Sequence, residues 1–458
     1  MQRYAYALPA EQELTARPRK IIRLTSFRLI LLGFAGLILA GALLLMLPVS
    51  VRSGNTVTFS DALFTSVSAV CVTGLVVRDT ASFWTPFGQA VLLLLIQIGG
   101  LGVVTFAVAI AQMSGRKVSL RQRTTMQEAV SAPQLGGMVP LTGMILRGTL
   151  LIEGVGALLL LPVFLPAYGL RGIWAAVFHA VSAFCNAGFD ILGTPESPFV
   201  SLTGYAADPL LCGTVMLLII TGGLGFLTWE DLRRNGLHIH RYHMQTKVIL
   251  AAAALLILLP ALFFFLTDLR DAPAGTRLLE ALFQSVTART AGFNTVDLTS
   301  MRSGSLAVLI VLMLIGGAPG STAGGMKITT FVILLANMAA VLFHREDAQL
   351  FGRRVDRKTI RTASALFGIY LLLFAGGALL ISTAEQLPLD ECLFETASAI
   401  GTVGLSLSLT PALGGLSRAV LMFLMFFGRV GGLTMFYAAI SAGDHRSSHL
   451  PVETISVG

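Results

Sequence analysis

The sequence predicts an all-α polytopic membrane protein with four consecutive helix–pore loop–helix repeats, giving eight membrane-spanning helices and four re-entrant pore loops around a central pore. Hydrophobic residues make up 55% of the chain and charged residues only 12%. Apolar runs near the bilayer-spanning length of about 20 residues recur along it. Between those runs, a polar stretch that ends in a glycine recurs four times, which indicates internal repeats.

The distribution of positive charge predicts how the chain is oriented. Its net charge of +8 could indicate nucleic-acid binding. However, 21 of the 32 Lys and Arg residues fall in stretches expected to be cytoplasmic, and seven fall in expected outer loops. This bias is the positive-inside pattern. We therefore expect both termini in the cytoplasm, anionic lipids as a secondary partner and no nucleic acid.

Cysteine and histidine spacing gives no sign of a catalytic or metal site. The cysteines show neither CxxC nor Cys/His spacing, so we interpret them as packing residues rather than disulfides or zinc ligands. They are Cys71, Cys185, Cys212 and Cys392. The histidines of interest lie on an expected pore helix or in a basic loop, at His179, His238, His240 and His243. We predict that the chain is not an enzyme and binds no organic cofactor.

The four copies of the polar stretch share a Phe, a Ser or Thr four residues later, and a Gly. They read DALFTSVSAVCVTGL (61–75), AAVFHAVSAFCNAGF (175–189), EALFQSVTARTAGF (280–293) and ECLFETASAIGTVGL (391–405). The Phe-to-Gly spacing is ten, ten, nine and ten residues, so the third copy is one residue shorter. Each copy lies between two apolar segments. The repeating unit is therefore a helix, a half-helix with a loop, and a second helix.

These units divide the chain into six parts. We expect a cytoplasmic N-terminal segment (1–27), repeat 1 (28–114), repeat 2 (115–234), repeat 3 (235–345), repeat 4 (346–443) and a cytoplasmic C-terminal tail (444–458). Helices before the pore loops are expected at 28–47, 141–166, 246–267 and 359–384. Those after them are expected at 87–111, 208–229, 304–343 and 416–441. Matched glycines occur in the second set, as GGLG at 99–102 and 222–225, GGAPG at 316–320 and GRVGG at 428–432.

Four polar loops at membrane depth predict a cation selectivity filter. Non-helical backbone is tolerated there only where protein or water surrounds it, a condition that loops meet by converging on one axis. Each half-helix then directs its negative C-terminal end at the centre, and backbone carbonyls can replace the hydration shell of a cation. A role as packing plugs is the alternative. The predicted filter residues are Val72, Thr73, Gly74, Asn186, Ala187, Gly188, Thr290, Ala291, Gly292, Thr402, Val403 and Gly404.

The segment 304–343 is too long for one membrane helix, because 40 helical residues would span about 60 Å, twice the hydrocarbon core. Its middle, GGAPGSTAGGMK (316–327), contains five glycines and a proline. We expect the helix to unwind there into a mobile intramembrane gate loop. A phosphate-binding loop is disfavoured because the Gly-Lys-Ser/Thr ending is absent. The gate residues predicted are Gly316, Gly317, Gly320, Ser321, Thr322, Gly324, Gly325, Lys327 and Arg429.

Four charged residues expected at membrane depth need partners. Arg429 is expected to face the gate loop, either as a positive barrier to ions or as a brace for the bundle. Arg289 stands three residues before Gly292, and we expect it behind the filter, hydrogen-bonded to loop backbone. For Glu153 and Glu395 we expect structural hydrogen bonding.

The loop motifs VTGL, NAGFD, TAGFNT and TVGL, with GGAPGSTAGGMK and GRVGG, resemble the Trk/Ktr/HKT superfamily of potassium transporters over essentially the whole chain. One helix precedes the first pore loop, so the chain looks like a Ktr-type membrane subunit. The resemblance implies potassium uptake across a bacterial cytoplasmic membrane, with the filter glycines, the 316–327 gate and a barrier at Arg429.

The same resemblance implies partners that composition does not reveal. These are a second copy of the chain in a homodimer and a cytosolic regulatory ring that binds ATP or ADP. Potassium would occupy the filter, with sodium as a candidate activator. All four filter positions are Gly, which favours potassium. The alternative function is a sodium- or proton-coupled secondary transporter of another small solute, for which inverted repeats would be expected.

Overall fold

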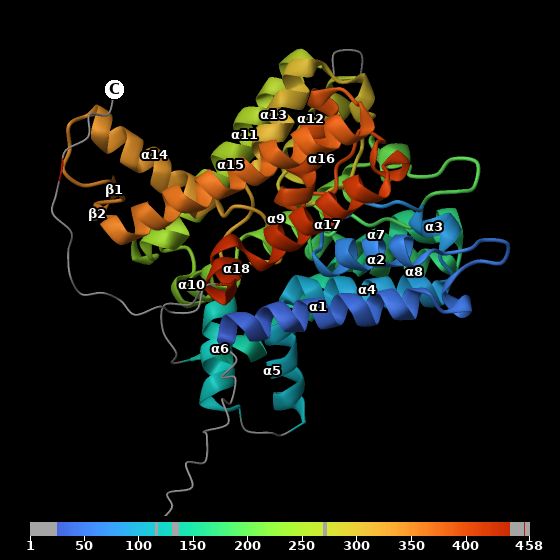
Figure 1. Ribbon diagram of the computed structural model, residues 1–458, viewed down its shortest axis with the longest axis horizontal. Coiled ribbons are helices and arrows are strands. Elements are labelled where there is room, and N and C mark those ends of the chain that lie inside the picture. Colours follow the sequence, from blue (N-terminus) through green and yellow to red (C-terminus); the bar gives the residue numbers. More distant parts are fainter. Residues whose placement is uncertain (1–24, 115–117, 131–136, 269–272, 440–452, 454–458) are drawn as a thin grey trace, which may run out of the picture.

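The computed structural model describes residues 25–114, 118–130, 137–268, 273–439 and 453. The expected N-terminal segment and C-terminal tail therefore lie almost wholly outside the described residues. Within the described ranges the regular elements are helices, apart from one short antiparallel hairpin between β1 (Gln349–Leu350) and β2 (Arg353–Arg354) (Figure 1). This all-helical architecture agrees with the fold class that the sequence predicts.

Each repeat contributes one long helix, one short pore helix and a second helix in two pieces. The long helices are α1 (Ser26–Leu45), α7 (Met138–Tyr168), α11 (Met244–Thr267) and α15 (Arg357–Glu385). The pore helices are α2 (Phe59–Val70), α8 (Arg171–Phe184), α12 (Ala274–Thr287) and α16 (Leu389–Gly401). The two-piece helices are α4 (Pro86–Leu101) with α5 (Val103–Met113), α9 (Pro209–Gly223) with α10 (Phe226–Asn235), α13 (Ser303–Leu314) with α14 (Ile328–Leu342), and α17 (Gly415–Val430) with α18 (Gly432–Ala439).

Short elements connect these helices. They are α3 (Thr80–Phe83), α6 (Leu120–Val130), and the 3₁₀ turns η1 (Pro48–Ser50), η2 (Thr203–Tyr205), η3 (Ile239–Arg241), η4 (Leu298–Ser300) and η5 (Thr410–Ala412). Several begin at side-chain caps, which satisfy amides that a helix leaves unpaired. Asp79, for example, accepts a hydrogen bond from the Ser82 amide at 2.7 Å at the start of α3.

The four long helices have the length and composition of membrane spans. Their outward faces expose leucines such as Leu43, Leu151 and Leu372, as lipid contact requires. Each long helix packs against the pore helix of its own repeat. The Phe that opens each sequence copy is fully buried on its pore helix, at Phe64, Phe178, Phe283 and Phe394. Apolar burial therefore fixes the pore helices inside the protein.

Three of the second helices bend sharply where the sequence analysis expected continuous helices. The expected helices at 87–111, 208–229 and 416–441 are each replaced by two helices that meet at 96°. The breaks fall at Gly102, Gly225 and Gly431, whose φ angles are +85°, +87° and +89°. Side-chain-bearing residues rarely adopt these values, whereas glycine does so freely. The expectation of a single broken helix, in repeat 3, was therefore wrong: every repeat has a break at its matched glycines.

Candidate functional site

Each pore helix ends at a loop with an unusual backbone. Two residues before each filter glycine, a side-chain-bearing residue has positive φ: Val72 at +54°, Asn186 at +57°, Thr290 at +70° and Thr402 at +51°. The glycines follow with φ of +90° (Gly74), +67° (Gly188), +83° (Gly292) and +95° (Gly404). Left-handed conformations cost free energy away from glycine and cluster at functional sites. The same pattern in four copies shows that all four loops adopt one backbone path.

The four loops close a ring, as the space beside each glycine shows. A Cβ added to Gly74 would lie within 3.0 Å of the Ala187 carbonyl oxygen, in the loop of the next repeat. An added Cβ would also lie within 3.0 Å of a carbonyl oxygen at the other three glycines: Gly188 against Ala291, Gly292 against Val403, and Gly404 against Thr73. The carbonyl before each glycine therefore lies against the glycine of the preceding loop. Eight of the twelve predicted filter residues make these contacts, and the other four are the positive-φ residues that precede them in each loop. A side chain at any of the ring glycines would displace a neighbouring carbonyl.

A cavity of about 350 Å³ opens on the side of the ring that carries the post-filter loops, and this side is called the outer side below. The cavity is lined by the four filter glycines and by polar residues from all four post-filter loops, among them Asp79, Asp190, Asn294 and Ser406. Asp79 also accepts a hydrogen bond from the Phe199 amide at 2.9 Å. Carboxylates in a concave, protein-lined mouth raise the local concentration of cations. Sequence reasoning did not single out Asp79 or Asp190, although Asp190 ends the NAGFD motif and Asp79 stands four residues after VTGL.

A second cavity, of about 200 Å³, lies on the other side of the filter. The non-helical segment between α13 and α14 forms part of its wall, together with residues at the breaks of repeats 1, 2 and 4. Ile30 and Phe34 of α1 add apolar surface, and the cationic side chains Lys327 and Arg429 also line it. Five of the nine predicted gate residues line this inner cavity: Gly320, Ser321, Gly325, Lys327 and Arg429.

The gate loop is hydrogen-bonded to the other breaks rather than free. The Ala318 amide donates to the Gly223 carbonyl at 3.0 Å, and the Gly325 amide donates to the Gly428 carbonyl at 3.0 Å. The Thr322 hydroxyl lies 3.0 Å from the carbonyl oxygen of Phe184 at the end of α8 and 3.0 Å from Oδ1 of Asn186 in the second filter loop. These contacts place the loop directly beneath the filter ring.

Arg429 joins three parts of the inner half. Its guanidinium donates to the carbonyl of Thr322 in the gate loop, to that of Gly99 at 2.5 Å and to that of Gly100 at 2.8 Å. Repeat 4 is thereby tied to the gate loop and to the break of repeat 1. Lys327, in contrast, folds back on its own loop, with Nζ 2.7 Å from the Ala323 carbonyl oxygen.

The remaining charged residues within the helices have different surroundings. Glu395 accepts hydrogen bonds from Ser406 and, at 2.7 Å, from Thr410, so it holds the loop that follows filter 4. Glu153 accepts from Gln97 at 3.2 Å, which links α7 to α4. Arg289 lies off the ring as expected, but the expected hydrogen bond is not made at its Nε, which has no partner in the described chain. Its side chain lines a small cavity of about 20 Å³ beside α9 and α11. The third loop turns this side chain away from the ring.

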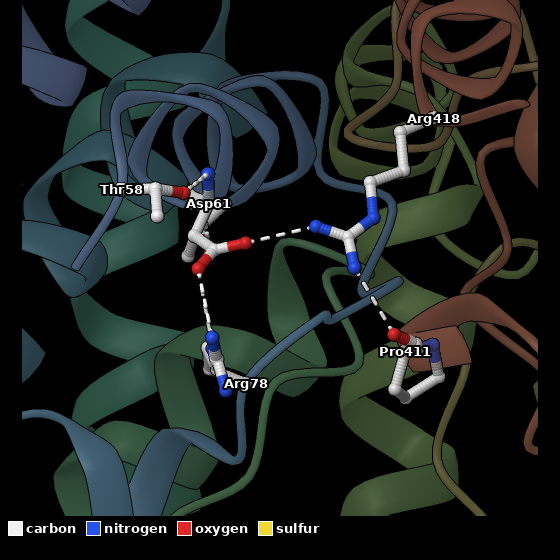
Figure 2. Close-up of polar contacts among 6 residues, drawn as sticks. Thr58, Asp61, Arg78, Pro411 and Arg418 are labelled. Atoms are coloured by element: carbon white, nitrogen blue, oxygen red, sulfur yellow. Dashed lines mark hydrogen bonds and ion pairs between the residues drawn. The ribbon is translucent and has the colours of Figure 1, made fainter. Parts of the chain in front are cut away.

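A buried carboxylate closes the seam between the first and last repeats (Figure 2). Asp61 of α2 is paired with Arg78 at 3.1 Å and with Arg418 of α17 at 2.9 Å. Arg418 also donates to the Pro411 carbonyl at 3.0 Å. Figure 1 shows α17, in red, running beside α2, in blue. Repeats 1 and 4 are neighbours in the ring with no direct chain connection, so this contact joins ends that the backbone leaves separate.

Comparison with known proteins assigns the family. A sequence model of the TrkH family, described as cation transport protein, matches residues 34–448. The chain belongs to the TrkH family of cation transport proteins. It is thus a multi-pass membrane protein of a transporter family and not an enzyme.

Named relatives match this chain over nearly its whole length. It is 38% identical to the potassium/sodium uptake protein NtpJ of Enterococcus hirae, over 95% of this chain and 98% of the relative. It is also 38% identical to the Ktr system potassium uptake protein B of Bacillus subtilis, over 92% and 94%. The crystal structure of the potassium transporter TrkH from Vibrio parahaemolyticus shares its fold, with a TM-score of 0.71 and 19% identity, over 92% of this chain and 85% of that one.

Proposed function

We propose that the chain is the potassium-translocating subunit of a Ktr-like uptake system in a bacterial cytoplasmic membrane. The observation that carries this proposal is the ring in which each filter glycine lies against the carbonyl before the next. Backbone carbonyls on one axis replace the hydration shell of a monovalent cation without binding it irreversibly. The names of its relatives, which are potassium or potassium/sodium uptake proteins, support the same cation class.

The proposal includes eight membrane spans, both termini in the cytoplasm, and a gate at 316–327. In its favour, the gate loop lies beneath the filter and Arg429 donates to its backbone. Two cationic side chains, Lys327 and Arg429, line the inner cavity, which supports a positively charged barrier on the proposed ion path. Opening then requires the loop and Arg429 to move away from that path. We propose that this movement is driven by a nucleotide-binding ring on which the chain sits as a homodimer, as the resemblance to Ktr systems implies.

Sodium is a second cation that the filter could admit or respond to. The residue after each filter glycine is a Leu or a Phe, namely Leu75, Phe189, Phe293 and Leu405. The Gly-Tyr-Gly sequence of strict potassium filters is therefore absent. One relative is named a potassium/sodium uptake protein. We therefore include weak sodium permeation, or activation by sodium, as the candidate variation on this function.

Uptake of radioactive rubidium into liposomes tests the proposal. The full-length protein is reconstituted, and excess unlabelled potassium or sodium is added outside in parallel. We expect potassium to compete strongly and sodium weakly, because the same carbonyl ring would coordinate both rubidium and potassium. Equal competition by both ions, or uptake no greater than in protein-free liposomes, would contradict the proposal. Repeating the assay with and without sodium inside or outside separates permeation from activation.

A further inference from the structure

The four pore-helix hydroxyls hold the filter in two different ways. Each occupies the position four residues after the pore-helix Phe, and each is fully buried, at Ser68, Ser182, Thr287 and Ser398. In repeats 1 and 4 the hydroxyl oxygen accepts from the filter glycine: Gly74 N lies 3.1 Å from Ser68 Oγ, and Gly404 N lies 3.0 Å from Ser398 Oγ. The sequence copies are alike at this position, but their hydrogen bonds are not.

In repeats 2 and 3 the hydroxyl instead donates to a carbonyl. Ser182 Oγ lies 2.7 Å from the carbonyl oxygen of Phe189, and Thr287 Oγ1 lies 2.7 Å from that of Phe293. These carbonyls belong to the residue after the filter glycine, on the outer side of the ring. The hydroxyl there holds the start of the post-filter loop.

Because the peptide bond is planar, this difference in hydrogen bonding affects the direction of the filter carbonyls. In a trans peptide the C=O and the N–H of one unit point in opposite directions. When Ser68 holds the Gly74 amide outward, the Thr73 carbonyl of the same unit must point inward, toward the ring. The Thr73 carbonyl oxygen does lie there, directly beside Gly404 of the neighbouring loop. By the same reasoning Ser398 directs the Val403 carbonyl, which lies against Gly292.

We infer that Ser68 and Ser398 are positioning residues for ion selectivity, each fixing the direction of one ion-facing carbonyl. Ser182 and Thr287 fix a carbonyl that turns away from the ring, so they support the outer mouth instead. Repeat 3 does not need the hydroxyl for its glycine, because the Gly292 amide is already 3.3 Å from the Thr287 backbone oxygen. This inference rests on the proposed function of the ring as a cation filter.

Two alanine variants on one helix separate filter support from general packing. Ser66 and Ser68 are both fully buried on α2, but the Ser66 hydroxyl donates to the Ile38 carbonyl of α1 at 2.7 Å, away from the filter. Ser68→Ala leaves the Gly74 amide without its partner, which frees the Thr73–Gly74 peptide to rotate. We expect the ratio of potassium to sodium competition against rubidium uptake to fall about tenfold in Ser68→Ala, and to stay within twofold of wild type in Ser66→Ala.

Three further variants complete the test. Ser398→Ala should reproduce the loss seen at Ser68, Ser182→Ala should change the ratio less than twofold, and Ser68→Thr, which keeps the hydroxyl, should restore it. The ratio is measured within one vesicle preparation, so a lower amount of folded protein does not affect it. Wild-type protein that selects potassium, with Ser68→Ala and Ser398→Ala indistinguishable from Ser66→Ala, would overturn this inference alone. Wild-type protein without potassium-selective uptake would overturn the proposed function first.

Discussion

The filter loops and the helix breaks beneath them are both built on glycine, but the four filter loops are alike and the four breaks are not. Each filter glycine has positive φ and lies against the next loop. Below them, three repeats break at a single positive-φ glycine with a 96° bend, whereas repeat 3 is non-helical from Ile315 to Lys327. An ion on the axis requires equivalent ligands from all sides. A gate requires only one part that can move.

The non-helical segment of repeat 3 contacts the breaks of the other three repeats. Its backbone is hydrogen-bonded to Gly223 of repeat 2 and Gly428 of repeat 4, and Arg429 links it to Gly99 of repeat 1. Three sharp, short breaks thus form a fixed frame around one long, glycine-rich segment. The comparison predicts that selectivity and gating can be altered separately in this chain, and the changes below are ordered by the size of their expected effect.

The largest effect is expected at the filter. Gly404→Ser adds a side chain where a Cβ would meet the Thr73 carbonyl, at a φ of +95°. We expect rubidium uptake to slow about 100-fold, equivalent to about 2.7 kcal/mol, and the preference for potassium over sodium to disappear. Gly54→Ser is the matched control, because Gly54 has a φ of +89° but nothing within 4 Å. Unchanged ion preference in Gly404→Ser would count against the ring as the filter.

The seam between repeats 1 and 4 tests whether the ring needs closure by side chains. Arg418 is 19% exposed and Arg78 is 46% exposed, and both pair with the same Asp61 carboxylate, which is 3% exposed. We expect Arg418→Gln to lower the free energy of unfolding by about 2–3 kcal/mol, because a nearly buried carboxylate loses its better-shielded partner. Arg78→Gln should cost about 1 kcal/mol or less, since solvent screens that pair.

Thermal unfolding of the two arginine variants in one detergent measures this difference. Equal losses of stability would mean that burial does not distinguish the two pairs. A change in ion preference is expected only for Arg418→Gln, because only Arg418 comes from the other side of the seam.

A smaller effect is expected at the gate. Deleting Ser321, Thr322 and Ala323 removes the Thr322 contacts to Arg429 and to the filter-2 loop. We expect rubidium uptake to rise about tenfold, equivalent to about 1.4 kcal/mol, with the potassium-to-sodium ratio unchanged. Thr322→Val is the control, because it removes the hydroxyl but keeps the loop length and the Thr322 carbonyl. A deletion variant with altered ion preference and normal flux would contradict the separation of filter from gate.

The sequence was sufficient for the repeats because each copy is marked by the same residue types at matching positions. A buried Phe, a hydroxyl residue and a glycine recur at nearly fixed spacing, and repetition does not depend on long-range contacts. The same reasoning missed the breaks at Gly102, Gly225 and Gly431. Glycine in an apolar run is compatible with a straight helix, so only the backbone angles of the fold distinguish a bend from a packing site.

Side-chain direction was the least predictable feature. Arg289 was expected behind the filter with a hydrogen bond to loop backbone, yet its Nε has no partner in the described chain, and its side chain lines a small cavity beside α9 and α11. The hydroxyls at Ser68 and Ser182 occupy the same position in the pattern but make opposite hydrogen bonds. Such differences depend on peptide orientation, which sequence spacing does not encode.

The smallest effect is expected where a break glycine touches nothing. Gly431 has a φ of +89° and no atom within 4 Å of an added Cβ, so Gly431→Ala introduces backbone strain alone. We expect a loss of about 1 kcal/mol in the free energy of unfolding and unchanged flux. Gly225 has nearly the same φ, +87°, but an added Cβ would lie 2.7 Å from the Pro319 carbonyl of the gate loop. Gly225→Ala should therefore also change rubidium flux, and equal flux in the two variants would show that the breaks do not support the gate.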